Sequence, residues 1–297
     1  MITVTLSQNR SLHIHTKPLV MGILNATPDS FYSGSRIEAG PDAVERARRM
    51  IADGADLLDV GGESSRPGSD YVDADEEISR VVPVIRAIRA FSDIPISIDT
   101  RKLAVAREAV AAGADMINDI SALRDDPGLA SFAADRGIPV VLMHMRGTPR
   151  TMQQNPHYND VVTEVLAELA AMVDMAMAAG IARDRIIIDP GIGFGKRMQD
   201  NVALLRAIDR FTATGLPVLI GASRKTFIGA LIAADGEQPR PPEERLAGTL
   251  AVHLHAATAG AHILRVHDVA ETVHALRVSA ALLPDRAAVQ PSAGGAA

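Results

Sequence analysis

The chain has 297 residues, of which 47% are hydrophobic and 22% are charged, and its formal net charge is −6. The length allows two small domains or one large domain, and the apolar fraction excludes a wholly disordered chain. The negative charge and an aromatic content of 3% argue against a protein that binds nucleic acid. Because the chain contains no cysteine, disulfides, thiol nucleophiles and cysteine-ligated metal centres are excluded.

The sequence also gives no sign of a membrane protein. No apolar run reaches the roughly 18 residues that a membrane-spanning helix requires. The first residues lack the basic and apolar segments of a secretory signal. We therefore expect a cytoplasmic protein with neither a membrane partner nor a nucleic-acid partner, in which local basic groups hold any bound anion.

Residues 1–18 predict an N-terminal β-hairpin. Two short runs with strand character, 3–6 and 12–15, flank the polar segment Gln8-Asn9-Arg10. We expect this hairpin to seal the bottom of the domain that follows it.

From residue 19 onwards a short apolar run is followed by a helical segment, and this unit occurs eight times. Glycines such as Gly113 and Gly137 follow the helical segments, as left-handed helix caps require. The expected strands are 19–24, 57–60, 95–99, 116–119, 139–144, 186–189, 217–221 and 263–266. The expected helices are 41–52, 75–90, 103–112, 128–136, 158–179, 201–211, 243–259 and 269–283.

The expected strands are apolar at successive positions, which is typical of parallel strands covered on both faces. Eight strand–helix units without a long linker predict an α/β protein, a single (β/α)8 TIM barrel over residues 19–283. An open, doubly wound sheet is the alternative fold. Residues 284–297 are expected to form a frayed tail.

Each expected strand ends in residues that can ionise or form hydrogen bonds. In a TIM barrel the carboxyl ends of the strands meet at one face, where active sites lie. A buried polar group without a partner costs several kcal/mol, so about eight such groups around one rim indicate a functional site. They are Asn25, the segment 61–68, Asp99, Asn118 with Asp119, His144, Asp189, the segment 223–225, and Arg265 with His267.

The charges at these strand ends fall into two groups. Arg66, Lys225, Arg265 and His267 follow strands that are neighbours once the barrel closes, so they predict a basic pocket for an anion such as phosphate. Three other residues follow strands on the opposite side and suit a flat heterocycle with alternating donors and acceptors. These three are Asp99, Asn118 and Asp189.

Two further motifs are read as structural. Residues 191–196, Gly-Ile-Gly-Phe-Gly-Lys, look like a phosphate-binding loop but match neither the Rossmann nor the P-loop spacing. His253 and His255 lie two positions apart on an expected helix and therefore point in different directions, which argues against a metal pair.

Taken together and in this order, the motifs resemble the dihydropteroate synthase family over about residues 19–283. The matching segments are 21–31, 61–68, 97–100, 117–119, 142–145, 189–196, 221–225 and 265–269. The resemblance implies a barrel enzyme that joins a dihydropterin carrying a methyl diphosphate to the amine of 4-aminobenzoate and releases pyrophosphate. It also implies Mg²⁺ as cofactor, a homodimer, and competition by sulfonamides for the aminobenzoate site.

The resemblance further implies roles for individual residues. Catalytic roles fall to Asp99, Asp189, Lys225, Arg265 and His267. The pterin diphosphate would be bound by Ser65, Asp99, Asn118, Asp189, Lys225, Arg265, Val266 and His267. The 4-aminobenzoate would be framed by Arg66, Pro67, Phe194, Lys225 and Thr226, at the start of a helix. Asn25 would carry the magnesium ion, and the loops 26–40 and 62–75 would close over the site.

Two alternative functions remain at this point. A pterin-binding methyltransferase module would share the barrel but would not need the segments 223–225 and 265–267. A catalytically silent paralogue would bind pterin without turnover. The second alternative is kept open by Ser33, which stands where the family usually has an aspartate.

Overall fold

Eight parallel strands form the centre of the structure, hydrogen-bonded in the order β8-β7-β6-β5-β4-β3-β10-β9. A parallel bridge between Ile188 and Val218 joins the two end strands, so the sheet closes into the predicted barrel. This computed structural model describes residues 2–6, 10–15, 17–26, 39–66 and 68–282. The strands are β3 (Leu19–Asn25), β4 (Leu57–Gly61), β5 (Ile96–Asp99), β6 (Met116–Asp119), β7 (Val140–Met143), β8 (Ile186–Asp189), β9 (Leu219–Ile220) and β10 (Ile263–Val266).

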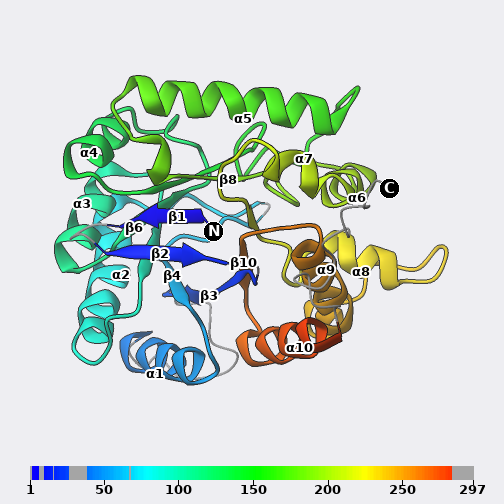
Figure 1. The fold of residues 1–297 in the computed structure, drawn as a ribbon, viewed down its shortest axis with the longest axis horizontal. Coiled ribbons are helices and arrows are strands. Elements are labelled where there is room, and N and C mark those ends of the chain that lie inside the picture. The colour runs from blue at the N-terminus through cyan, green and yellow to red at the C-terminus, as the bar shows by residue number, and fades with distance from the viewer. Residues whose placement is uncertain (1, 7–9, 16, 27–38, 67, 283–297) are drawn as a thin grey trace, which may run out of the picture.

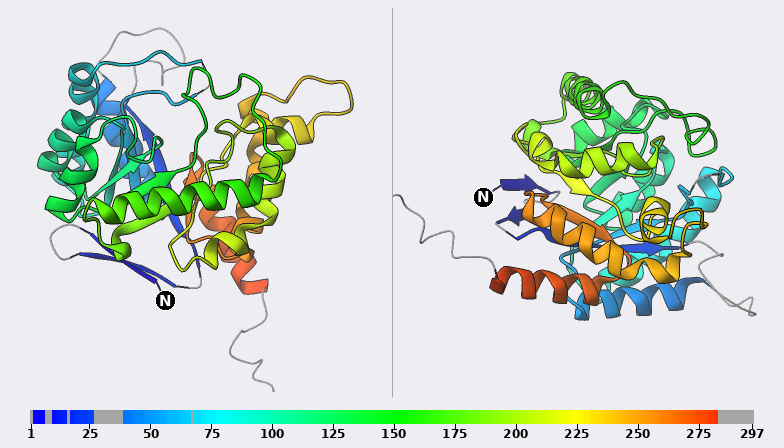
Figure 2. Two further views of the ribbon diagram at one scale, coloured as in Figure 1. Left: turned by 90° about the horizontal axis from the view of Figure 1, so that it is seen from above. Right: turned by 90° about the vertical axis from the view of Figure 1, so that its right-hand side faces the viewer.

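Helices surround the barrel, as Figure 1 and the two views of Figure 2 show. They are α1 (Ala39–Ala52), α2 (Ala74–Arg89), α3 (Leu103–Ala112), α4 (Gly128–Arg136), α5 (Val161–Ala178), α6 (Met198–Arg206), α7 (Ile208–Thr212), α8 (Thr226–Ile232), α9 (Leu246–Thr258) and α10 (Val269–Leu282). The predicted barrel fold is therefore confirmed, and most predicted element boundaries lie within a few residues of the observed ones.

The N-terminal hairpin covers one end of the barrel (Figure 2, left). Its strands β1 (Ile2–Thr5) and β2 (Ser11–Ile14) pair antiparallel, with Val4 opposite Leu12. The hairpin residues Val4, Leu6, Leu12 and Ile14 pack against inward-facing residues of the barrel strands, including Met21, Leu57, Met116 and Ile187. This apolar plug covers the amino-terminal end of the barrel, so the polar strand ends at the other end are the place to look for a site.

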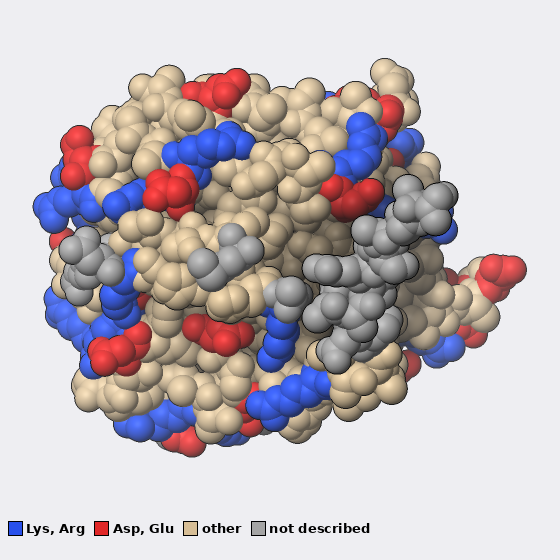
Figure 3. Space-filling view, in the orientation of Figure 1, with Lys and Arg blue, Asp and Glu red and all other residues tan. Residues whose placement is uncertain are grey.

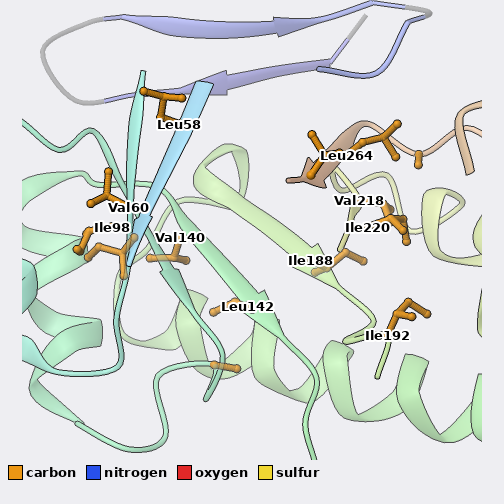
Figure 4. Close-up of a cluster of buried hydrophobic side chains, with 14 of the residues drawn as sticks. Leu58, Val60, Ile98, Val140, Leu142, Ile188, Ile192, Val218, Ile220 and Leu264 are labelled. Carbon is orange, nitrogen blue, oxygen red and sulfur yellow. The ribbon is translucent and has the colours of Figure 1, made fainter. Parts of the chain in front are cut away.

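The second hydrophobic layer lies between the strands and the helices. Leu58, Val60, Ile98, Val140 and Leu142 point outward into it (Figure 4). Because neighbouring strand residues face opposite sides of a sheet, the residues between them point into the barrel. This double coverage explains why the strands are apolar at successive positions.

Three predicted elements differ from the structure. The helix expected at 158–179 begins at Val161, because the carboxylate of Asp160 accepts hydrogen bonds from Val162 and Thr163 at the first turn. The helix expected at 201–211 is two helices, α6 and α7, which meet at a tight turn at Ala207. The strand expected at 217–221 is only the two residues of β9, and the short helix α8 follows it.

Candidate active site

The barrel interior changes from apolar at the hairpin end to polar at the carboxyl end. In the sheet register Asp59 of β4 lies beside Ser97 of β5, and Asp99 lies beside Asn118 of β6. Asp59 and Ser97 are wholly buried, and Asn118 is nearly so. On the surface, by contrast, acidic and basic side chains are interspersed over the face shown in Figure 3. The polar interior is therefore the chemically distinctive part of the molecule.

A buried ion triad crosses the barrel mouth. Arg265 of β10 donates from Nε to a carboxylate oxygen of Asp59 at 2.6 Å, and from a terminal nitrogen to Asp99 at 2.7 Å. Burial would lower the pKa of Arg265, but the charges of Asp59 and Asp99 outweigh it and raise the pKa above its usual value. Arg265 is thus a permanent cation. The sequence interpretation separated the basic and acidic groups, whereas the structure brings Arg265 into contact with Asp99.

Asp59 is a site residue that the sequence interpretation missed. The same carboxylate oxygen that binds Arg265 also accepts a hydrogen bond of 3.0 Å from the amide of Asn118. Its second oxygen and the hydroxyl of Ser97 are buried without a hydrogen-bond partner among the described residues. The signal in the sequence was a carboxylate within the apolar strand 57–60, two positions from the inward-facing Leu57.

The carboxylates of Asp99 and Asp189 are acceptors in the barrel mouth. Burial raises the pKa of Asp99 to about 7, the charge of Arg265 opposes this shift, and Asp59 reinforces it. Burial also raises the pKa of Asp189, against the charge of Lys225. One oxygen of Asp189 accepts a hydrogen bond of 2.7 Å from the backbone of Gly191. N–H donors of a bound ligand would favour the ionised form of both carboxyl groups.

Lys225 ends the loop between β9 and α8 and faces the loop that follows β8. It donates a hydrogen bond to the carbonyl of Ile192, and its ammonium lies 4.3 Å from the centre of the Phe194 ring. Burial lowers the pKa of Lys225 to about 7, and the charge of Asp189 opposes this shift. Thr226 is the first residue of α8 and is exposed. Lys225, Phe194 and Asp189 thus share one wall of the site.

The neighbouring Arg224 turns away from the site. Its backbone has a left-handed φ of 55°, and its guanidinium binds Asp268 with a nitrogen–oxygen distance of 2.8 Å. The backbone nitrogen of Arg224 donates a hydrogen bond of 3.0 Å to the hydroxyl of Thr249. These contacts turn consecutive side chains in different directions and leave Lys225 to face the barrel mouth.

His267 is neutral in this site. Burial lowers its pKa to about 3, and the charges of Arg265 and Arg66 contribute to the shift. Its ring Nδ1 lies 3.0 Å from the hydroxyl of Ser223, which also accepts a 3.2 Å hydrogen bond from the backbone of His267. The sequence interpretation counted His267 among the basic groups, but its surroundings make it a neutral hydrogen-bonding group.

The remaining predicted residues lie around the same mouth or outside the described part of the chain. Ser65 is half-buried and shares a hollow with Asp99, while Arg66 is exposed. Asn25 ends β3 and is half-buried. The side chain of Val266 packs in the outer hydrophobic layer and therefore does not face the site. Pro67 and Ser33 lie outside the described residues.

Within the described part of the chain, no group of three or more His, Cys, Asp or Glu residues could hold a metal ion. None of the helices described there is long and apolar enough to cross a membrane.

Comparison with known proteins decides the family. A family model described as pterin binding enzyme matches residues 21–267. The dihydropteroate synthase of Escherichia coli strain K12 is 47% identical over 277 residues, which cover 93% of this chain and 95% of that protein. The chain belongs to the dihydropteroate synthase family.

Solved structures agree with this assignment to the dihydropteroate synthases. The Xanthomonas albilineans enzyme with 4-aminobenzoic acid has a TM-score of 0.86 at 48% identity, covering 95% of this chain and all (100%) of that one. The same enzyme in complex with 7,8-dihydropteroate has a TM-score of 0.84 at 45% identity, with the same coverage of 95% and 100%. The Yersinia pestis dihydropteroate synthase in a sulfonamide drug complex has a TM-score of 0.87 at 42% identity, covering 94% of this chain and 98% of that one.

The resemblance, the fold and the transferase function predicted from the sequence are confirmed.

Proposed function

We propose that the chain transfers the methylene-linked pterin of a dihydropterin diphosphate to the amine of 4-aminobenzoate, releasing pyrophosphate, in tetrahydrofolate synthesis. This proposal rests mainly on the polar barrel mouth. There Arg265 binds the carboxylates of Asp59 and Asp99. The charges of Asp189 and Lys225 also act on Arg265 or on each other. The Xanthomonas albilineans relative binds 4-aminobenzoic acid in one structure and 7,8-dihydropteroate in another.

The pterin edge is assigned to Asp99, Asn118, Asp189 and Lys225. Carboxylates accept hydrogen bonds from ring N–H and amino groups, and an amide both donates and accepts. Asp59 holds the amide of Asn118 and so fixes which of its ends faces the ligand. Because the acidic groups surround the ring, they favour positive charge that develops on the pterin as the leaving group departs.

The diphosphate is assigned to Ser65, Arg265, the main chain at Val266, and His267. The hydroxyl of Ser223 accepts from the backbone of His267 and can donate to the ring Nδ1, and in that tautomer the ring proton lies on Nε2. That N–H can donate to a phosphate oxygen without carrying charge. The permanent cation at Arg265 supplies the charge that stabilises the departing anion.

The amine substrate is assigned to Arg66, Pro67, Phe194, Lys225 and Thr226. In the reaction the bond between the methylene carbon and the diphosphate oxygen breaks, and its electron pair leaves with pyrophosphate. The neutral amine nitrogen bonds to the methylene carbon and then releases a proton. None of these steps requires a nucleophilic side chain, so the protein contributes orientation, charge stabilisation and exclusion of water.

Mg²⁺ is proposed as the cofactor, with Asn25 as its protein ligand. Mg²⁺ keeps several waters and is commonly bound by one or two protein oxygens together with substrate phosphates. A single amide at the end of β3 fits this pattern, and the described residues offer no preformed cage. When bound, the ion would neutralise charge on the diphosphate.

A homodimer in the cytoplasm is also proposed, on the strength of the family resemblance. Sedimentation equilibrium of the purified chain distinguishes a dimer from a monomer of 31.4 kDa.

The deciding experiment is a pyrophosphate-release assay with the dihydropterin diphosphate, 4-aminobenzoate and Mg²⁺, in which each component is omitted in turn. We expect release to require both organic substrates and Mg²⁺. Transfer of the methyl group of a methyl-tetrahydrofolate to an added corrinoid would instead support the methyltransferase module. If the parent is inactive and Ser33→Asp restores release, the silent-paralogue function is correct.

A further inference from the structure

The loop of residues 191–196, here called the glycine loop, is contacted by two lysine side chains, one of them its own. Lys225 donates to the carbonyl of Ile192 and lies over the ring of Phe194. The ammonium of Lys196, the last residue of the loop, donates to the carbonyl of Phe194 at 3.0 Å. The proposed reaction gives a role to Lys225 and none to Lys196.

The glycines of this loop allow close packing. Gly191 has a φ angle of 67°, and a Cβ atom there would lie 1.9 Å from the carbonyl oxygen of His144. Gly195 has a φ angle of 62°, and a Cβ atom there would lie 2.8 Å from the carbonyl oxygen of Arg146. A Cβ atom at Gly193 would lie 2.8 Å from the side chain of Lys225. The motif that resembles a phosphate loop is thus packed against Lys225 and the segment that follows β7. These contacts set its position.

Lys196 is an unusual buried lysine. Its side chain is 3% exposed, and its acceptors are two carbonyls and the ring Nδ1 of His144 at 3.0 Å, none of which is charged. The similarly buried Lys102, by comparison, contacts the carboxylates of Glu63 and Glu77. Burial lowers the pKa of Lys196 to about 7, with the charge of Asp189 opposing the shift. An apolar side chain would avoid this desolvation penalty.

The contacts of Lys196 continue outward to helix α5. The other ring nitrogen of His144, Nε2, lies 2.9 Å from one carboxylate oxygen of Glu168. The other oxygen of Glu168 binds Arg146. Since Lys196 donates to Nδ1, Nε2 carries the ring proton and donates to Glu168. Burial lowers the pKa of His144 to about 3, so the ring remains neutral. One hydrogen-bonded chain therefore connects the Phe194 carbonyl to α5.

We infer that Lys196 is a positioning residue for the amine substrate, because it fixes the Phe194 carbonyl and thereby the ring that faces Lys225. The inference rests on the proposed function, in which Phe194 and Lys225 frame 4-aminobenzoate. Of the four residues assigned to the pterin edge, Asp99 and Asn118 lie on β5 and β6 and bond to Arg265 and Asp59 instead of to Lys196, whereas Asp189 interacts with Lys196 through its charge. We therefore expect pterin binding to change less than amine binding when Lys196 is changed.

The test is Lys196→Met, which keeps an unbranched side chain one atom shorter than lysine and removes the three hydrogen bonds of the ammonium. We expect the KM for 4-aminobenzoate to rise at least about tenfold, while kcat at saturating amine changes less than about threefold. Calorimetric Kd values for the dihydropterin diphosphate should stay within about twofold. Asp115→Asn is the control, since it disturbs an equally buried ionic contact at the hairpin end and should leave both constants unchanged.

Glu168→Gln provides a second variant if Lys196→Met does not fold. It weakens the outer end of the same chain and should raise the same KM by about twofold to fivefold. Parent-like KM values in the folded variants would overturn the inference. So would an equal loss of pterin affinity and amine affinity, because that indicates general disruption. A parent protein that releases no pyrophosphate would refute the proposed function before any variant is compared.

Discussion

Nε of Arg265 lies 2.6 Å from a carboxylate oxygen of Asp59, although the two residues are 206 positions apart in the chain. The contact orients the only guanidinium of β10, and Asp99 binds its other end at 2.7 Å. A buried arginine between two carboxylates is fixed in direction, because any rotation would leave a charge without its partner. The triad therefore sets where a diphosphate can be bound.

Asp59→Asn should test this relationship. The change keeps the shape and removes one negative charge, so Arg265 keeps only Asp99 as a charged partner. We expect the free energy of unfolding to fall by about 1–3 kcal/mol and kcat/KM for the dihydropterin diphosphate to fall at least about tenfold. Urea denaturation and steady-state kinetics measure the two effects. A lower free energy of unfolding with an unchanged kcat/KM would show that Asp59 only balances the charge of Arg265 and does not orient it for catalysis.

Lys225→Ala should reduce turnover while the barrel stays folded. The ammonium lies at the barrel mouth, between the Ile192 carbonyl and the Phe194 ring, and its loss opens no cavity in the hydrophobic layers. We expect kcat/KM to fall at least about 100-fold, which corresponds to ~2.7 kcal/mol of transition-state stabilisation. Circular dichroism should be unchanged. Activity within about threefold of the parent would contradict the role given to Lys225.

Much of the fold follows from the sequence because its signals are local. Glycine caps and buried strand runs mark the barrel units, and the polar residues at the strand ends then meet at one face by topology alone. Asp59 could have been added by the same logic, since it shares the inward face of β4 with Leu57.

The directions of long side chains could not be predicted in this way. Arg265 lies in β10 and Arg224 follows β9, but Arg265 reaches past β3 to Asp59 on β4 and Arg224 binds Asp268 instead. Their directions depend on partners far away in sequence and, for Arg224, on a left-handed backbone. The break at Ala207 is equally a tertiary effect, because the local sequence continues to favour helix.

Asp115→Asn should weaken the attachment of the N-terminal hairpin. Asp115 is 1% exposed, and its carboxylate binds Arg10 from the hairpin and Arg89 from α2 and accepts a 2.8 Å hydrogen bond from the backbone of Ile96. Loss of its charge should lower the free energy of unfolding by about 1–3 kcal/mol. Hydrogen exchange should increase in β1 and β2 more than in the barrel. Uniform exchange rates would contradict a local anchoring role.

The pH dependence of stability should depend in part on His253. This side chain is wholly buried in α9, with Nδ1 3.2 Å from the hydroxyl of Thr272, and burial lowers its pKa to about 4. The unfolded chain takes up a proton near pH 6.5, the usual pKa of histidine, but the native chain does so only near pH 4. Between these values the unfolded state binds more protons, so the free energy of unfolding falls as the pH falls.

The contribution of His253 should reach on the order of 3 kcal/mol by pH 4. His253→Gln retains a polar partner for Thr272 and removes the titration, so the variant should lose less stability than the parent between pH 7 and pH 4. His144 and His267, whose pKa values burial also lowers, maintain part of the pH dependence of stability in both proteins.

His255→Gln, at an exposed position of the same helix, is the matched control. It should retain the pH dependence of the parent because His253 is still present. Chemical denaturation at several pH values decides the point. Parallel curves for the parent and His253→Gln would mean that the buried histidine does not contribute to acid sensitivity.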